Sequence, residues 1–423
     1  MKKILILLVI VVATLTVAPR FIGATAEEKI RELYQQANQN PAWNFEIVEY
    51  NRGWFSSQLK VDISLDATNL PTADHFKISL IHDMQHGPLL WKTGGIGVGL
   101  VDTVYGIELP VDIQAELGEH QQVVSATSRM DFDGSNISIL KINPFSIDKD
   151  QNKIDVLAGK FITDIDLSGH ISMNGNWKGM SLKSKDNTNV ELTDLSIDME
   201  QTSINGEIFG PNALFEGDME MLIKSIKSVG PEAINIENFS IKSTSQFRDD
   251  VADFFVFFGI DKLSIPGQEF TELNYDIGFE NFSKESLLEL QEVLSEGNNA
   301  IDPTQTMQKL QSLVPKLLEK NPVLKVNHLG MKTSSGEIDS TATISISKDK
   351  YDPKNLMSLM MAVDAVANGF APEAFFTGLG MDADVNALVQ QNFLVRDGDQ
   401  LKFNASFKNG QALLNGTSIP LGM

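Results

Sequence analysis

The sequence contains no cysteine among its 423 residues. This excludes disulfides, thiolate metal sites and cysteine nucleophiles, and also a lipoprotein anchor, which needs a cysteine to carry the lipid. Basic residues are scarce too, with 34 lysines and arginines against 56 acidic residues and a formal net charge of −22. No basic stripe follows the first 20 residues, so we expect no nucleic-acid partner. The acidity would also repel the body of the protein from anionic headgroups.

Familiar catalytic motifs are missing as well. The chain has neither the GxSxG elbow of serine hydrolases nor the HExxH motif of zinc proteases. Hydrophobic residues make up 42% of the chain, which suits a folded protein. The length favours two lobes or one elongated body over a single ordinary core. We therefore expect a folded, non-catalytic protein, for which the sequence identifies no catalytic, cofactor-binding or metal-binding residue.

The N-terminus has the form of an export signal. Lys2 and Lys3 precede an apolar run over residues 4–18 that is interrupted only by two threonines. The lysines should stay in the cytoplasm and place the rest outside. Cleavage after Ala26 would release a soluble periplasmic protein, and without cleavage the segment would remain as a signal anchor in the inner membrane. Thr25 and Glu28 have capping-box spacing, which predicts an amphipathic helix that begins there and favours the anchor.

The body alternates between apolar and polar residues from Trp43 onward. Leu59, Val61, Ile63 and Leu65 alternate with polar side chains, which is typical of antiparallel strands with one buried face. Turn signals separate these runs, and similar strand pieces recur at irregular spacing, which predicts hairpins side by side in one long twisted sheet. The signals are Asn51-Arg52-Gly53, Asp133-Gly134, Asn174-Gly175 and Asn205-Gly206.

Helical patterns appear late in the chain. Residues 283–296 predict one helix, and Asp302 followed by Pro303 predicts the start of another, which Pro315 should kink or split. Residues 353–368 predict a third helix, and residues 372–392 a fourth that is interrupted near Gly378. A closing hairpin is expected from residue 401 to 419, with its turn at residues 409–410.

Several short motifs, taken in order, resemble the YdgA-like family of bacterial envelope proteins. They are the N-terminal anchor, residues 50–57 (Tyr-Asn-Arg-Gly-Trp-Phe-Ser-Ser), His86-Gly87-Pro88, residues 394–399 (Leu-Val-Arg-Asp-Gly-Asp) and Asn415-Gly416. The resemblance spans nearly the whole chain and implies a protein of unknown function that is anchored in the inner membrane and faces the periplasm. It implies no reaction. A looser likeness, in architecture only, is to AsmA-like proteins, which are thought to handle lipids.

Histidines offer the best metal candidates. His82 and His86, with His75 nearby, have a spacing that would suit zinc on a helix. However, the segment continues the pattern of a strand, on which the two would lie about 13 Å apart, too far to share one ion. The interpretation as polar strand residues beside the Gly87-Pro88 turn is preferred, and His120, His170 and His328 form no second cluster.

Two other motifs suggest ligands on first inspection. The glycine-rich residues 94–99 lack the spacing of a phosphate-binding loop, so a bulge or close backbone packing explains them better. Asp131, Asp133 and Asn136 could bind calcium, as could Asp397-Gly398-Asp399, but tight hairpin turns account for the same residues.

Two apolar segments are ambiguous between core and binding surface. Residues 254–258 (Phe-Phe-Val-Phe-Phe) predict a central strand buried on both sides, or alternatively a strand that lines an apolar groove. Met357, Met360 and Met361 would suit either an irregular core or an adaptable binding surface.

Together these patterns predict a β-dominated α+β fold with a long twisted antiparallel sheet and helices in the C-terminal third. Four regions are expected: a signal anchor or signal peptide (1–26), an amphipathic helix (27–42), a β-rich region (43–282), and helical segments with the closing hairpin (283–423). The preferred function is a periplasmic binding or structural module that handles lipid or another apolar ligand. A protein-interaction or assembly factor at the inner membrane and an unrecognised envelope hydrolase are the alternatives.

Overall fold

The computed structural model describes most of the chain. Backbone and side chains are described within residues 14–38, 44–64, 77–109, 114–115, 117, 122–149, 151–185, 188–206, 208, 213–230, 233–291, 293, 308–310, 312–352, 355 and 357–419, and the backbone alone at residues 2–13, 43, 65, 292, 294–299, 303–307 and 311. The chain folds into two compact units, residues 1–185 with 196–215, and residues 186–195 with 216–423. Both are built mainly from antiparallel strands, which confirms the β-dominated α+β fold class.

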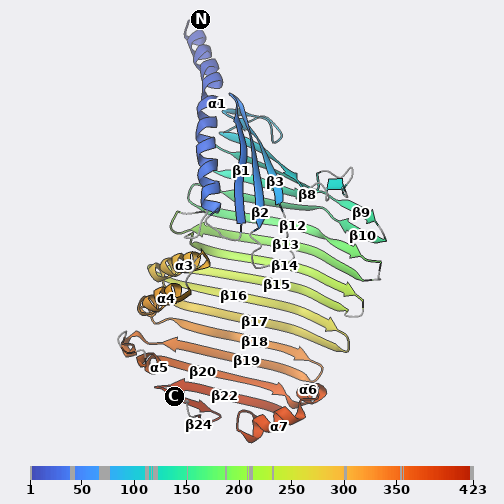
Figure 1. Ribbon diagram of the computed structural model, residues 1–423, viewed down its shortest axis with the longest axis vertical. Coiled ribbons are helices and arrows are strands. Elements are labelled where there is room, and N and C mark those ends of the chain that lie inside the picture. The colour runs from blue at the N-terminus through green and yellow to red at the C-terminus, as the bar shows by residue number, and fades with distance from the viewer. Residues whose placement is uncertain are drawn as a thin grey trace. The chain divides into compact units, whose positions relative to one another are not determined.

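The first unit combines one long helix with a sheet (Figure 1). Helix α1 (Lys2–Ala37) runs without a break through Pro19, and its C-terminal half lies beside β1, β2 and β3. A small core lies between them, made by Tyr34 together with Leu59, Val61 and Met84 of the strands. Within the part of the chain whose side chains are described, no helix is both long and apolar enough to cross a membrane.

Consecutive hairpins build the sheet of the first unit. Neighbours pair antiparallel in the order β1–β2–β3–β6–β7–β8–β11–β12, and β10 joins β9 to β12. The hairpin β4–β5 stands apart as a second, two-stranded sheet. The strands are β1 (Trp43–Arg52), β2 (Ser56–Leu65), β3 (Lys77–His86), β4 (Leu89–Leu90), β5 (Gly97–Val98), β6 (Val101–Glu108), β7 (Val124–Met130), β8 (Asn136–Ile142), β9 (Phe145–Lys149), β10 (Asn152–Val156), β11 (Gly159–Ile165), β12 (His170–Lys183) and β13 (Asn189–Ser203), the last of which is divided between the units.

The second unit is a sheet of longer strands with short helices. β14 to β20 pair in chain order, and β22 adds to β20 before the chain ends in β23 and β24. The strands are β14 (Phe215–Val229), β15 (Ile234–Arg248), β16 (Val251–Ile265), β17 (Gln268–Ser283), β18 (Val323–Thr333), β19 (Gly336–Ile346), β20 (Val363–Pro372), β21 (Val395–Asp397), β22 (Gln400–Lys408), β23 (Gln411–Leu414) and β24 (Thr417–Ile419). The helices are α3 (Lys284–Asn299), α4 (Pro303–Leu317), η1 (Lys348–Lys350), α5 (Ser358–Ala362), α6 (Glu373–Gly378) and α7 (Asp382–Gln390).

Several predicted helices are confirmed. α3 and α4 lie where the sequence predicted the first two late helices, and α6 and α7 form the interrupted fourth region. Pro315 does not split α4, because it stands in the last turn, two residues before the helix ends. The predicted cap at Asp302 lies outside the described residues. The closing hairpin is confirmed, with Asn409 and Gly410 both at positive φ in its turn, and a further turn at Asn415 separates β23 from β24.

Three local predictions were wrong. The helix expected to begin at Thr25 is the continuation of α1, because contacts with the sheet stabilise the helix before that capping box. Residues 363–368 belong to β20 rather than to a helix, since pairing with β19 and β22 outweighs the helical pattern. Asn174-Gly175 lies within β12 rather than in a turn, because the backbone approaches Phe161 so closely that a Cβ on Gly175 would lie 2.4 Å from its ring.

Candidate functional site

The sheet of the second unit has two chemically different faces. Side chains opposite each other in paired strands point to the same side, and successive residues alternate. Phe258 of β16 pairs with Tyr275 of β17, and Tyr275 pairs with Leu329 of β18. Ile241 of β15 lies on the other side of Phe258 in the same row. One face of β15 to β18 is therefore apolar along this row.

A groove opens on this apolar face across β15 to β19. Its volume is about 460 Å³, within the usual range for small-molecule sites. Phe258 and Tyr275 stack at its centre, with ring centroids 6.3 Å apart. No charged residue lines it, and its few polar side chains are Asn274, Tyr275 and Ser340. The lining residues are Phe239, Phe258, Gly259, Ile260, Leu273, Asn274, Tyr275, Leu329, Gly330, Met331, Ile338 and Ser340.

The opposite face of the same strands is polar and carries ion pairs. Lys242 of β15 contacts Glu220 of β14 at 2.9 Å, and Lys325 of β18 contacts Glu280 of β17 at 2.7 Å. Lys242 follows Ile241 and Lys325 follows Leu324, both of which point to the apolar face, so alternation turns the two lysines to the other face. These charged side chains therefore point away from the groove.

The apolar face is partly exposed to solvent. Leu329 is 47% exposed and Phe258 is 37% exposed, although both lie in internal strands. Phe279 and Ile344, two rows away on the same face, are exposed to a similar extent. An internal strand that presents large apolar side chains to solvent on one face is typical of a binding surface.

The phenylalanine-rich segment 254–258 contributes directly to this face. It is a central strand, as predicted, paired on both sides by β15 and β17. The expectation that it is buried on both sides was wrong, because no residue of the segment is fully buried and Phe258 is exposed. Phe254 and Phe258 point to the apolar face, whereas Phe257 pairs with Lys242 on the polar one.

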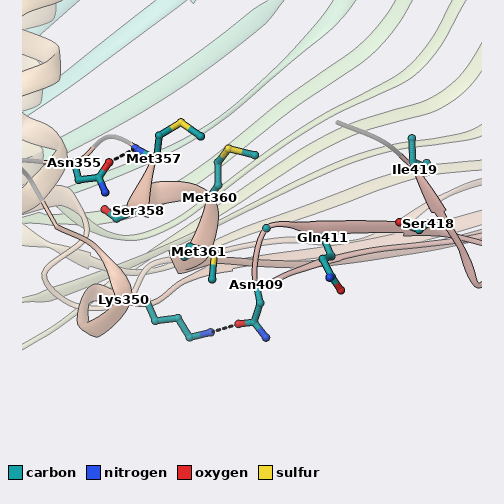
Figure 2. Close-up of a pocket in the computed structure, with 11 residues that line it drawn as sticks. Lys350, Asn355, Met357, Ser358, Met360, Met361, Asn409, Gln411, Ser418 and Ile419 are labelled. Carbon is teal, nitrogen blue, oxygen red and sulfur yellow. Dashed lines mark hydrogen bonds between the residues drawn. The ribbon is translucent and has the colours of Figure 1, made fainter. Parts of the chain in front are cut away.

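A second, larger pocket lies elsewhere in the second unit, beside α5. Its volume is about 580 Å³, and Figure 2 shows Met357, Met360 and Met361 on one side of it and Asn409 on the other. Polar side chains form much of its remaining wall: Lys350, Asn355, Ser358, Gln411 and Ser418. The methionines therefore line a surface hollow rather than a core. The smaller groove is the stronger candidate because its walls are uniformly apolar and continue an exposed apolar face.

The two histidines predicted as metal candidates lie in β3 of the first unit, with their side chains toward α1. Both are on one strand as preferred, but they are buried, His82 at 6% and His86 at 2% exposure. Each has its own partner: the Tyr34 hydroxyl lies 2.7 Å from Nε2 of His82, and Ser57 Oγ lies 2.8 Å from Nε2 of His86. Burial lowers the pKa of His82 to about 4 and also lowers the pKa of His86. Both rings are therefore neutral near pH 7.

The Ser57–His86 pair has the spacing of a nucleophile and its general base. Ser57 is only 1% exposed, however, and the His86 ring is enclosed by Gly23 of α1. A Cβ on Gly23 would lie 2.3 Å from Cε1 of His86. The pair is therefore closed to a substrate in this arrangement. The absence of a side chain at Gly23 is what lets α1 approach the sheet closely.

Replacing Gly23 with alanine should destabilise the packing of α1 on the sheet. The added methyl group meets a buried ring rather than a flexible side chain, and overpacking of this kind costs about 1–3 kcal/mol. Hydrogen exchange of the α1 amides would measure the loss. Thr25→Ala, at an exposed position of the same helix, is the matched control and should change little. Unchanged protection in Gly23→Ala would contradict the close packing described here.

The other sequence candidates are structural. The glycine-rich residues 94–99 lie in and beside the hairpin β4–β5, and Asp131 and Asp133 form the turn between β7 and β8. Residues 397–399 form the turn into β22. His170 and His328 each contact one carboxylate, while His75 and His120 lie outside the described residues. Within the part of the chain that is described, no group of three or more acidic or histidine side chains is placed to hold a metal ion.

Most residues of the groove carry no distinguishing signal in the sequence. Leu273, Leu329, Met331 and Ile338 were part of ordinary alternating patterns, and nothing in their spacing distinguished them from core residues. The register between strands is what brings them together with Phe258. Only the unusual apolar density of residues 254–258 signalled this face in advance.

A family described as "Bacterial protein of unknown function (DUF945)" matches residues 1–422. No curated protein and no solved structure matches the chain.

Proposed function

The chain belongs to the bacterial family of unknown function DUF945, and from that premise we propose that it is a non-catalytic envelope protein that binds lipid acyl chains on the apolar face of its second unit. The groove between Phe239 and Ile338 is the proposed site. The proposal includes the finer likeness to YdgA-like proteins, which would imply a location at the inner membrane on the periplasmic side.

The observation that carries the proposal is the uncharged groove on an exposed apolar face. Each methylene group moved from water into such a site contributes about 0.8 kcal/mol. Because the groove has no charged side chain, it would hold the chain of a lipid rather than its headgroup. An acyl chain also suits an open groove that continues into further apolar rows, toward Phe279 and Ile344.

The N-terminal sequence supports the proposed location at the inner membrane. The apolar residues 4–18 belong to α1, behind the two lysines that form the charged part of an export signal. Whether α1 stays as an anchor or is cut after Ala26 leaves the groove unchanged, because the groove belongs to the second unit. A protein-interaction role is the alternative, and the exposed Met357 and Met361 of the larger pocket favour it, since methionine suits adaptable surfaces.

Leu329→Gln should weaken lipid binding, whereas Val366→Gln should not. Leu329 is 47% exposed on the apolar face, and Val366 is 48% exposed on the polar face, so the two changes are matched in chemistry and exposure. Loss of about 1.5 kcal/mol of apolar contact corresponds to about a tenfold rise in Kd. Binding of a pyrene-labelled long-chain fatty acid would be measured by fluorescence titration, and co-purified lipid by native mass spectrometry.

The control variant separates the groove from other lipid contacts. Lipid that surrounds an anchoring helix would be retained equally by both variants. Equal binding in the wild type, Leu329→Gln and Val366→Gln would count against the groove, and absence of any bound acyl chain would leave the protein-interaction role as the better account.

A further inference from the structure

Four turns of the first unit lie at the same end of its sheet. Because neighbouring strands are antiparallel, the connections β1–β2, β3–β6, β7–β8 and β11–β12 all fall at one end. Contacts link each turn to the next: the His86 amide donates to Phe55 O, the Leu100 amide donates to Met130 O, and Leu167 packs beside Gly134. They form one continuous border, here called the turn rim.

Each turn of the rim exposes a large apolar side chain. Ile96 is 84% exposed and Leu167 is 74% exposed, so most of each side chain is open to solvent. Two of the protein's four tryptophans are here, in the first two turns. Exposed apolar residues of the rim include Trp54, Phe55, Trp91, Ile96, Phe132 and Leu167.

The rim adjoins α1 at the end of the apolar run. The indole of Trp54 donates a hydrogen bond to the carbonyl of Thr16, and the Arg20 guanidinium lies over the Trp54 ring, 5.1 Å from its centroid. Residues 4–18 of the same helix make up the apolar run. The exposed side chains therefore begin where that run ends, which is where a helix entering a bilayer would leave the hydrocarbon.

The chemistry of the rim suits the headgroup level rather than the hydrocarbon. Tryptophan is enriched at membrane interfaces, because its ring is apolar and its N–H finds a polar partner. Asp133 and Asp166 lie in the same turns, where each accepts hydrogen bonds from the amide and the hydroxyl of a serine two residues on. These carboxylates would keep the turns at the headgroup level and out of the hydrocarbon.

The other end of the same strands differs in composition. Among its described connections, Asn143, Gln151 and Lys185 are polar, and Leu157, 47% exposed, is the large apolar side chain open to solvent. Within the described residues, the exposed apolar side chains are therefore concentrated at the turn rim.

We propose that the turn rim is a membrane-docking surface that rests on the interface of the bilayer entered by residues 4–18. The side chains of Trp91, Ile96 and Leu167 insert among the headgroups, and α1 and the rim then hold the first unit at the membrane by two separate contacts. This goes beyond acyl-chain binding, because it concerns another unit and a lipid surface rather than one lipid.

Single spin labels on the full-length chain would test the proposal. The protein has no cysteine, so Ile96→Cys and Leu167→Cys each give one labelling site. In phosphatidylcholine nanodiscs, electron paramagnetic resonance would compare the collision rates of the label with oxygen and with a water-soluble nickel chelate. We expect the ratio of oxygen to nickel collisions to be several-fold higher at residues 96 and 167 than at an aqueous position.

Leu157→Cys is the matched control. Residue 157 is also apolar and exposed, but it lies just before the first residue of β11, whereas Leu167 lies just after the last. A label introduced by Ile10→Cys reports whether α1 has entered the bilayer. If residue 10 is in the membrane while residues 96 and 167 are as aqueous as residue 157, the proposal is wrong and the rim is better explained as a protein-binding surface. Aqueous values at residues 10, 96 and 167 alike would overturn it too.

Discussion

Replacing Asp102 with alanine should lower the free energy of unfolding of the first unit by about 3–5 kcal/mol, the usual cost of breaking a buried ion pair. Asp102 is fully buried, and its carboxylate accepts two hydrogen bonds from Arg129, at 2.7 and 2.8 Å. It also accepts hydrogen bonds from the backbone amides of Lys92 and Thr93. Burial by itself would raise the pKa of Asp102, but the bonds from Arg129 and Thr93 hold it below its usual range.

The size of the effect comes from what the substitution leaves behind. Without Asp102, the Arg129 guanidinium loses its counter-charge and two backbone amides lose their acceptor. These amides belong to the segment that leads from β4 to β5, so the loss should extend to that hairpin. Hydrogen exchange of the amides of β6 and β7 would measure it within the first unit.

Two further variants define the comparison. Glu108→Ala removes an ion pair with Lys60 in the same unit, whose side chains are 53% and 33% exposed, and it should change stability far less because solvent screens the pair. Adding Arg129→Met to Asp102→Ala should recover part of the loss, since the unpaired charge is then removed. A loss below about 1 kcal/mol in Asp102→Ala would show that the pair is not the buried network described here.

Lowering the pH from 7.5 to 5 should destabilise the first unit through His82. Its folded pKa is about 4, while the unfolded value is near 6.5, so below pH 6.5 the unfolded chain binds a proton that the folded chain does not. The stabilisation is complete above pH 6.5 and is lost as the pH falls toward 4. The full effect is about 3 kcal/mol, of which about 2 kcal/mol is lost by pH 5. His86, whose pKa is also lowered by burial, acts in the same direction.

Urea unfolding at several pH values, followed by hydrogen exchange of β2 and β3, would measure this dependence. His82→Gln keeps a polar partner for the Tyr34 hydroxyl but cannot take up the proton. The variant should be less stable at pH 7.5, and its stability should depend less on pH between 7.5 and 5. An identical pH dependence in the wild type and in His82→Gln would contradict the buried, neutral histidine.

Much of the fold could be predicted because its signals are local. Alternation marked residues 59–65 and 76–80, of which the described part forms β2 and β3, and the Asn409-Gly410 signal placed the last hairpin. The failures occurred where distant pairing outweighed local preference. Residues 363–368 carry a helical pattern, but the strands on both sides recruit them into β20.

The candidate sites were harder to anticipate, because proximity between distant strands creates them. His82 and His86 were noticed as candidate ligands, yet the approach of α1 is what buries them beside Tyr34 and Ser57. The groove depends on register in the same way, since a shift of one residue in β18 would turn Leu329 toward the polar face.

By itself, the sequence determined the strand-rich class and the exclusion of thiol chemistry, since the first follows from a period of two along the chain and the second from composition. Only the tertiary structure decided which apolar residues stay exposed. Alternation assigns a side chain to a face but does not say whether another layer covers that face. That is why Leu329 and Ile96, indistinguishable from core residues in the sequence, mark surfaces in the folded protein.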